Sequence, residues 1–220
     1  MILEKIETKY LNTNEKIFLS FLKGDSKYPY KGDMFRFLII KTNISKDMIA
    51  SFFESLLKDL SIYRLEDLYI VIYNNKERVE IENFADMFNE DVGYKALFFE
   101  GFVINKNNRS KFIDFLEMFI CNYQFTNTYS NISDFILAIN DKKELLKELR
   151  TIVLSKYLND NSFLNMVNAL FKDNLNVSKA ASDLYMHRNT LNNKLYSFKN
   201  ETTLSIQNFN DAVALYELIK

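Results

Sequence analysis

Several residue types are scarce in this chain of 220 residues, and each scarcity excludes a kind of site. The single cysteine, Cys121, rules out an internal disulfide and a multi-cysteine zinc site. The single histidine, His187, has no second histidine or nearby cysteine to help it hold a metal ion. The four glycines form neither a P-loop nor a Gly-x-Gly-x-x-Gly phosphate cradle, and no hydrolase or metalloprotease motif occurs. We therefore expect no catalytic residues, no metal and no cofactor.

Long apolar runs and a strong net charge are also missing. No segment approaches the roughly 18 apolar residues of a membrane span. The N-terminal stretch MILEKIETKY has charges every few residues and lacks the apolar core of a signal peptide. We therefore expect a cytoplasmic protein without a membrane partner. The net charge of −1 excludes a chain that is basic throughout, but DNA binding needs only a local basic face.

Tryptophan is absent, so the 20 Phe and 13 Tyr residues must supply much of the core. Residues 26–33 contain the only proline, Pro29, and predict a loop. Around it, strand and helix patterns alternate through residue 123. The expected strands are 34–42, 68–73 and 94–104, the last with a bend at Gly101. The expected helices are 14–22, 45–60, 81–88 and 109–123. This alternation predicts a small α/β, ferredoxin-like sheet with helices on one face.

Four features of this first part carry further expectations, and two of them have a competing interpretation. Helix 45–60, capped by Ser45, has a wide apolar stripe that needs a sheet to cover it, made of Met48, Ile49, Phe52, Phe53, Leu56, Leu57 and Leu60. Cys121, within FIDFLEMFICNY, is expected to be a buried thiol. Phe112, Phe115 and Phe119 are expected in the core, with a dimer face as the alternative. The pair Glu66 and Asp67 is expected in a solvated turn, with metal binding as the alternative.

The pattern becomes helical after residue 124. Residues 124–131 (QFTNTYSN) are mostly polar and predict a connector. Helices are expected at 132–139, at 141–158 with Asp141 and Glu144 as a capping box, from Asn161 or Ser162 onward, and at 209–219. We therefore expect an α/β sensory or dimerisation domain at 1–124, a helical linker at 125–160 and a helix-turn-helix domain at 161–220.

The stretch 176–198, NVSKAASDLYMHRNTLNNKLYSF, contains two short helical patterns joined by a tight turn. The apolar residues are spaced for one face of each helix, at Val177, Ala181 and Leu184, then at Leu191, Leu195 and Phe198. The other face of the second helix carries polar residues, with Arg188 at its start and Lys194 on its flank. Residues 176–200 contain four cationic side chains and one anionic one, Asp183, a local balance of +3. The pattern predicts a helix-turn-helix whose second helix enters a DNA major groove.

The segment 163–219 resembles the C-terminal helix-turn-helix of PucR/CdaR-type bacterial transcription regulators, which is itself similar to the DNA-binding part of the Fis protein. The matching residues are Asn176-Val177-Ser178, Ala180-Ala181, Leu184-Tyr185-Met186 and His187-Arg188-Asn189-Thr190-Leu191. The resemblance implies that the last run opens the recognition helix, 188–198. The DNA-binding residues expected from the pattern and the resemblance together are Ser178, His187, Arg188, Asn189, Thr190, Asn192, Asn193 and Lys194. His187 could instead cap that helix.

This chain departs from the family pattern at several positions. Asn192 stands where members usually have a basic residue, and Asn193 where they have an aromatic one. Glu201 and Thr202 stand near the place of a glycine that normally ends the segment. A lost positive charge weakens phosphate contact, although asparagine can still bond phosphate or adenine. Upstream, residues 14–123 are similar to the degenerate cyclase-like (GGDEF-like) domain of many members, but residues 64–71 lack the glycines of an active cyclase.

The sequence therefore predicts an α+β protein, with a small ferredoxin-like, degenerate cyclase-like domain followed by an all-α helix-turn-helix domain. The expected function is sequence-specific regulation of transcription, through binding of double-stranded DNA as a homodimer. An unidentified small molecule is a possible effector. The alternative is an interaction or co-regulatory protein that retains the helix-turn-helix fold without binding DNA. A nucleotide-processing enzyme would need activity or a metal in residues 14–123.

Overall fold

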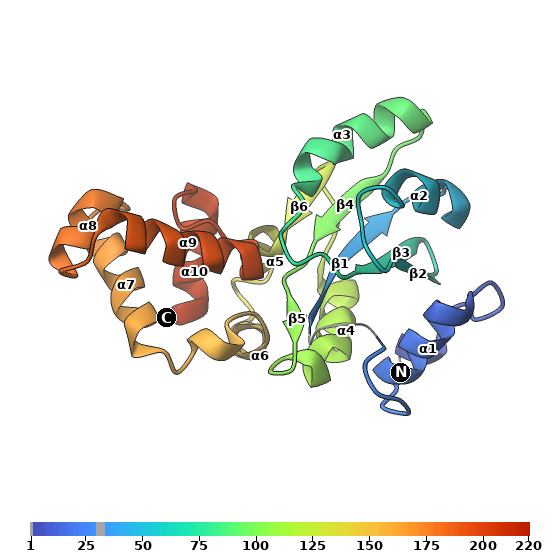
Figure 1. Ribbon diagram of the computed structural model, residues 1–220, viewed down its shortest axis with the longest axis horizontal. Helices are drawn as coiled ribbons and strands as arrows, with labels where there is room; N and C mark the ends of the chain where they lie inside the picture. The colour runs from blue at the N-terminus through green and yellow to red at the C-terminus, as the bar shows by residue number, and fades with distance from the viewer. Residues whose placement is uncertain (1, 30–33) are drawn as a thin grey trace. The chain divides into compact units, whose positions relative to one another are not determined.

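The computed structural model describes residues 2–29 and 34–220, so the end of the loop predicted at 26–33 lies outside the described residues. The chain divides into two compact units, Met1–Ile132 and Ser133–Lys220, and each is described by itself (Figure 1). Among the described residues no helix has both the length and the hydropathy needed to span a membrane.

The first unit is a sheet with helices packed on it. Its strands are β1 (Met34–Lys41), β2 (Ser61–Leu65), β3 (Leu68–Tyr73), β4 (Leu97–Glu100), β5 (Ile104–Asn105) and β6 (Tyr129–Asn131). Its α-helices are α1 (Thr13–Leu22), α2 (Lys46–Phe53), α3 (Ile81–Val92) and α4 (Phe112–Asn122). Short 3₁₀ turns occupy Ile2–Glu4 and Arg109–Lys111.

The strand order is β2-β3-β1-β4-β6, with β5 paired to β1. All pairs are antiparallel except β4 with β6, which is parallel. In the middle of the sheet, Ile39 of β1 lies opposite Ile70 of β3 on one side and Phe99 of β4 on the other. The run β1-α2-β2-β3-α3-β4 with this order is the split βαβ arrangement of ferredoxin-like domains. The predicted α+β class and ferredoxin-like sheet are therefore confirmed.

Helices cover both faces of this sheet, so the prediction of helices on one face is wrong (Figure 1). On one face, Leu38 and Ile40 join a core cluster with Phe53 of α2 and Phe88 of α3. On the other face, the Phe37 ring lies 5.0 Å from that of Phe112 in α4. Both faces are covered because the side chains of β1 are buried on both sides of the sheet. A strand that is apolar on both faces needs cover on both.

The α2 region differs most from the sequence-based expectation. Ser45 caps the helix as predicted, but the helix ends at Phe53 and not near residue 60. Residues 54–60 instead turn back, with Asp59 in the left-handed region, so that the unpredicted strand β2 can pair with β3. Met48, expected in the apolar stripe, is 42% exposed. Tertiary pairing with β3 overrides the helical spacing that continued through this stretch.

Cys121 is exposed, which corrects the expectation of a buried thiol. The buried side of α4 contains Phe112, Phe115 and Phe119, as predicted for a core stripe. Cys121 lies nine residues after Phe112, which at 100° per residue places it on the opposite side of the helix. Helical spacing therefore decides its exposure here, against the general tendency of cysteine to be buried.

The predicted polar connector contains the short strand β6, which a buried charged network attaches to β4. Glu100 is 1% exposed and receives two hydrogen bonds from the Arg78 guanidinium, each 2.6 Å, and one of 2.6 Å from the Tyr129 hydroxyl. Burial alone would lower the pKa of Arg78, but its hydrogen bond and charge pairing with Glu100 outweigh that effect and raise it. Burial, followed by the charge of Glu100, raises the pKa of Tyr129. This network adds to the backbone pairing of β6 with β4 and to the hydrogen bond of 3.1 Å from the Ser130 hydroxyl to the Phe98 carbonyl.

The second unit is entirely helical. Its helices are α5 (Ile132–Ala138, beginning at the last residue of the first unit), α6 (Lys143–Val153), α7 (Asn161–Lys172), α8 (Val177–Asp183), α9 (Arg188–Thr202) and α10 (Phe209–Ile219), with a 3₁₀ turn at Ser155–Tyr157. Helix α10 has the predicted bounds. Helix α6 ends earlier than predicted, and no side-chain hydrogen bond caps its start, so Asp141 does not form the expected capping box. Leu146, not Leu145, is its buried leucine in that turn.

Candidate nucleic-acid interface

Helices α7, α8 and α9 pack around one small apolar core. Helix α8 contributes Val177, Ala180 and Ala181, and α9 contributes Leu191, Leu195, Phe198 and Thr202. Helix α7 contributes Phe163, Met166, Val167 and Leu170, the set predicted from the sequence. The Phe163 and Phe198 rings lie 4.9 Å apart and both contact Tyr157. Two short helices are thereby held although neither would be stable alone.

The turn between α8 and α9 has the hydrogen bonds of a Schellman motif. The Met186 N–H donates to the Ala181 carbonyl at 2.8 Å, and the Tyr185 N–H donates to the Ser182 carbonyl at 3.0 Å. Tyr185 adopts φ +52°, the left-handed conformation that glycine favours. Its side chain is 99% exposed, so the residue gains no packing in return. The turn fixes the direction in which α9 leaves α8.

His187 is the N-cap of α9. Its Nδ1 atom accepts a hydrogen bond of 3.2 Å from the Asn189 N–H. This geometry requires the neutral ring to carry its proton on Nε2. The capping alternative raised from the sequence is therefore confirmed for His187, and its exposed ring remains beside the first turn of the helix.

The predicted contact residues lie on the surface. Seven of the eight are exposed: Ser178, His187, Arg188, Asn189, Thr190, Asn193 and Lys194. Asn192 is half-buried. Asn189 and Asn193 lie one turn apart and opposite the buried stripe of α9 at 100° per residue. Arg188 is exposed at the helix start but lies off this line, about 60° from Leu191 at 100° per residue. Lys194 lies on the flank, where its Nζ donates to the Ser162 hydroxyl at 2.9 Å.

Other outward positions on α9 were missed by sequence analysis. Tyr196, which is 63% exposed, continues the line of Asn189 and Asn193, and Asn200 follows it half-buried. The spacing i, i+4, i+7, i+11 could have found them. We call Asn189, Asn193, Tyr196 and Asn200 the amide stripe of α9. It has three asparagines and no charged side chain.

Cationic side chains beside α8 are paired with acids, which leaves fewer of them without a partner although the local charge balance is unchanged. Lys179 Nζ lies 2.9 Å from the carboxylate of Asp173, which is fully buried at the end of α7. Lys172 Nζ lies 2.8 Å from the Asp183 carboxylate. This hydrogen bond raises the pKa of Lys172 and lowers that of Asp183. Arg188 and Lys194 on α9 are therefore the cationic groups best placed to meet a nucleic acid.

Helix α9 ends without the glycine that usually ends this segment in PucR/CdaR-type regulators. The helix continues through Thr202, and Thr203 adopts φ +65° at the C-cap. The Thr202 hydroxyl donates to the Phe198 carbonyl at 2.8 Å and accepts from the Leu204 N–H at 3.2 Å. These bonds help hold a β-branched residue in a conformation it disfavours.

The arrangement described above defines a helix-turn-helix protein. Residues 163–219 match the family of PucR C-terminal helix-turn-helix domains. The chain thus carries the helix-turn-helix domain of a family of transcription regulators. It has 13% identity to the crystal structure of a regulator of polyketide synthase expression from Bifidobacterium adolescentis, with a TM-score of 0.43. That alignment covers 94% of this chain and 90% of the other. No curated protein matches the chain.

Proposed function

We propose that this protein regulates transcription by binding double-stranded DNA as a homodimer, with α9 in the major groove. The observation that supports this most strongly is the exposure of Asn189 and Asn193 on the side of α9 opposite its buried stripe, with Arg188 exposed at the helix start. A helix that presents donors and acceptors on a convex face fits the groove, whose base edges offer complementary groups. The exposed N-terminus of α9 is also suited to a phosphate.

The amide stripe points to the bases that would be recognised. Asparagine pairs in a bidentate manner with the N6 and N7 atoms of adenine. Asn189 and Asn193 are four residues apart, about 6 Å along the helix axis. Because base pairs are spaced by about 3.4 Å, we expect each half-site to contain adenines about two base pairs apart. Arg188 would add a guanine or a phosphate contact.

A dimer is proposed because one module offers too little surface for specific regulation. Single small modules bury about 600–1,000 Å² on DNA, and two-fold dimers place recognition helices about 34–36 Å apart. In this proposal residues 1–124 form a sensory or dimerisation domain derived from a cyclase-like fold. Residues 125–160 form a helical linker, and residues 161–220 bind DNA. The exposed turn at Glu66 and Asp67 then has no catalytic role.

The test begins with selection of bound duplexes from a random pool, followed by a salt series on the selected site. Arg188→Ala should weaken specific binding by about 1–3 kcal/mol. Lys194→Ala should weaken binding to all duplexes and reduce the slope of log K against log salt by about 1. Lys143→Ala, an exposed lysine at the start of α6, is the matched control and should leave both quantities unchanged.

The second candidate is an interaction protein that no longer binds DNA. The pairing of Lys179 with Asp173 and the half-burial of Asn192 favour it, because both reduce the groups available to phosphates. It predicts that no duplex is enriched by selection and that binding does not depend on salt. Wild-type affinity in both Arg188→Ala and Lys194→Ala would rule out α9 as the contact helix.

A further inference from the structure

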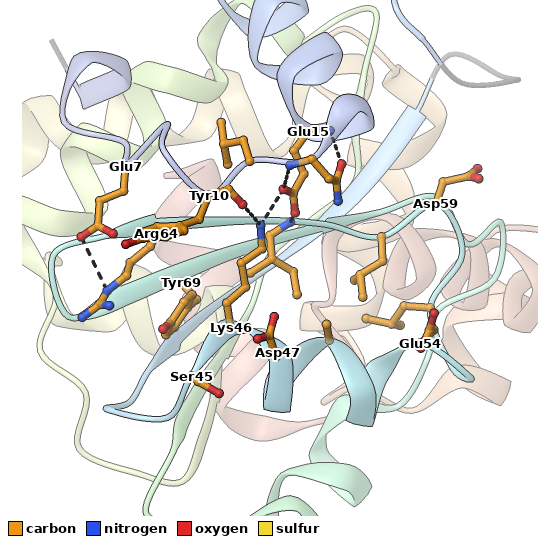
Figure 2. Close-up of a pocket in the computed structure, with 16 residues that line it drawn as sticks. Glu7, Tyr10, Glu15, Ser45, Lys46, Asp47, Glu54, Asp59, Arg64 and Tyr69 are labelled. Atoms are coloured by element: carbon orange, nitrogen blue, oxygen red, sulfur yellow. Dashed lines mark hydrogen bonds and ion pairs between the residues drawn. The ribbon is translucent and has the colours of Figure 1, made fainter.

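The N-terminal unit contains a cavity of about 770 Å³, and every residue that lines it belongs to that unit. It lies between the segment before α1, the first turns of α2 and the outer edge of β2, as Figure 2 shows. Glu7, Tyr10 and Arg64 lie at one end, and Glu54 and Asp59 lie at the other. Its volume falls within the range of about 300–1,000 Å³ found for small-molecule sites.

The walls of this cavity are held in place by Glu15, whose side chain is 2% exposed. Its carboxylate accepts hydrogen bonds from the Asn12 N–H at 2.8 Å, the Ile62 N–H at 3.0 Å and Lys46 Nζ at 2.5 Å. Because Ile62 lies in β2 and Lys46 begins α2, one carboxylate joins three parts of the wall. The cavity is therefore built into the fold, and a ligand would not have to order it.

The lining has more negative than positive charge. Five carboxylates line the cavity, those of Glu7, Glu15, Asp47, Glu54 and Asp59, against the cationic groups of Lys46 and Arg64. Lys46 pairs with Glu15, and Arg64 lies 3.8 Å from Glu7. In the described part of the chain, the other three carboxylates have no ion pair. A concave site with an excess of three negative charges attracts cations and repels anions.

The shape of the lining distinguishes between kinds of cation. Among the described residues no three acidic, histidine or cysteine side chains come together as ligands for a metal ion. The carboxylates are instead spread along the cavity, with Glu7 at one end and Glu54 and Asp59 at the other. Apolar side chains also line it, those of Ala50, Leu57, Leu60 and Ile62. A matching ligand has several positive charges separated by methylene groups, and each buried methylene contributes about 0.8 kcal/mol.

We propose that this cavity binds a linear aliphatic polyamine. Its ammonium groups pair with Asp47, Glu54 and Asp59, and its methylene groups lie against Leu57 and Leu60. This site is independent of the DNA-binding proposal. If both hold, the polyamine is the small-molecule effector and the N-terminal unit is its sensor.

The test is calorimetric titration of spermidine into the full chain without DNA, at an ionic strength of about 0.15 M. The double variant Glu54→Gln with Asp59→Asn removes two charges, and asparagine tolerates the φ of +52° at residue 59. The control, Asp86→Asn with Glu90→Gln, removes the same charge from the exposed side of α3. We expect one spermidine per chain, binding weakened about tenfold or more in the cavity variant, and wild-type binding in the control.

Three outcomes would overturn the proposal. The first is no saturable binding by the wild type, and the second is equal weakening in both double variants, which would indicate unspecific attraction. The third is displacement of spermidine by Mg²⁺ at matched ionic strength, which would indicate an inorganic cation site. Thermal unfolding of each variant verifies that it is folded. Because no DNA is present, none of these outcomes bears on binding by α9.

Discussion

In the N-terminal unit the charged groups of Arg36 and Glu100 are each 1% exposed and lie among strands that are buried on both faces. On α9 of the second unit, Arg188 and Asn193 stand on a surface with only an apolar stripe beneath them. Buried charges require partners, so those of the first unit serve its architecture. Exposed donors and acceptors remain available to another molecule. Arginine is thus part of the buried framework in the first unit and an exposed donor in the second, according to what surrounds it.

The largest expected effect comes from removing a partner in the buried network. Glu100→Gln removes the buried carboxylate from Arg78, which is 10% exposed, and leaves it the longer 3.6 Å ion pair with the exposed Glu80. We expect unfolding of the N-terminal unit to become easier by about 3–5 kcal/mol. Urea unfolding followed by circular dichroism measures this. Glu144→Gln, which breaks the exposed pair with Lys147, is the control and should cost about 0.5 kcal/mol or less. If both variants lost the same free energy of unfolding, the buried ion pair would be no more important for stability than the exposed one.

The next effect concerns the close contact at the bend after β4. A Cβ atom added to Gly101 would lie 2.1 Å from the Phe37 ring. Gly101→Ala should therefore destabilise the unit by about 1–3 kcal/mol, because the ring is fully buried and cannot withdraw easily. The control is Gly24→Ala, where nothing lies within 4 Å and only the left-handed backbone opposes the change. Gly101→Ala with wild-type stability would show that Phe37 has room to move.

A third prediction tests whether the exposed side chain of Asn193 on α9 recognises a base, and it rests on the proposed DNA binding. Asn193→Ala should lower affinity for the selected site about tenfold when adenine is present, and much less when that base pair is changed. Competition binding on the two duplexes measures the selectivity. Stability should stay within about 0.5 kcal/mol of wild type because the side chain is exposed. An equal loss on both duplexes would assign Asn193 to the phosphates.

The smallest effect is expected at the turn between α8 and α9. Tyr185→Gly removes the strain of a left-handed conformation that costs about 1–2 kcal/mol. Part of this gain in stability is lost because glycine gives the unfolded chain more conformational entropy. We expect the free energy of unfolding to rise by about 0.5 kcal/mol, as measured by thermal unfolding. A loss of stability would mean that the 99% exposed ring makes a stabilising contact after all.

The sequence was most informative where local spacing and packing agree. The bounds of α10, the apolar set of α7 and the two helices of the turn were all predictable, because each helix buries a single stripe. The helix expected at 81–88 begins where predicted and continues to Val92, with Gly93 as its left-handed C-cap. The same spacing, applied more strictly, would have placed Cys121 on the surface and added Tyr196 to the outer face of α9.

Elsewhere, long-range contacts outweighed the local signals. Strand β2 was missed although its hairpin with β3 is local, with only Glu66 and Asp67 between the strands. The bond from the Ile62 N–H to Glu15, which joins β2 to the start of α1, spans 47 residues and leaves no local signal. Strand β6 was missed because Tyr129 depends on Glu100, 29 residues earlier. Lys179 was counted as a free charge because its partner, Asp173, becomes buried only when α7 packs on α8.

By itself, the sequence determined the helix-turn-helix, since the apolar stripes and the run His187-Arg188-Asn189-Thr190-Leu191 need only local geometry to define it. It also determined the α+β class through its alternating patterns. Only the tertiary structure decided which polar groups are exposed, that helices cover both faces of the sheet, and that a cavity with excess negative charge lies beside α2. Burial and charge pairing depend on neighbours distant in sequence, and folding alone brings them together.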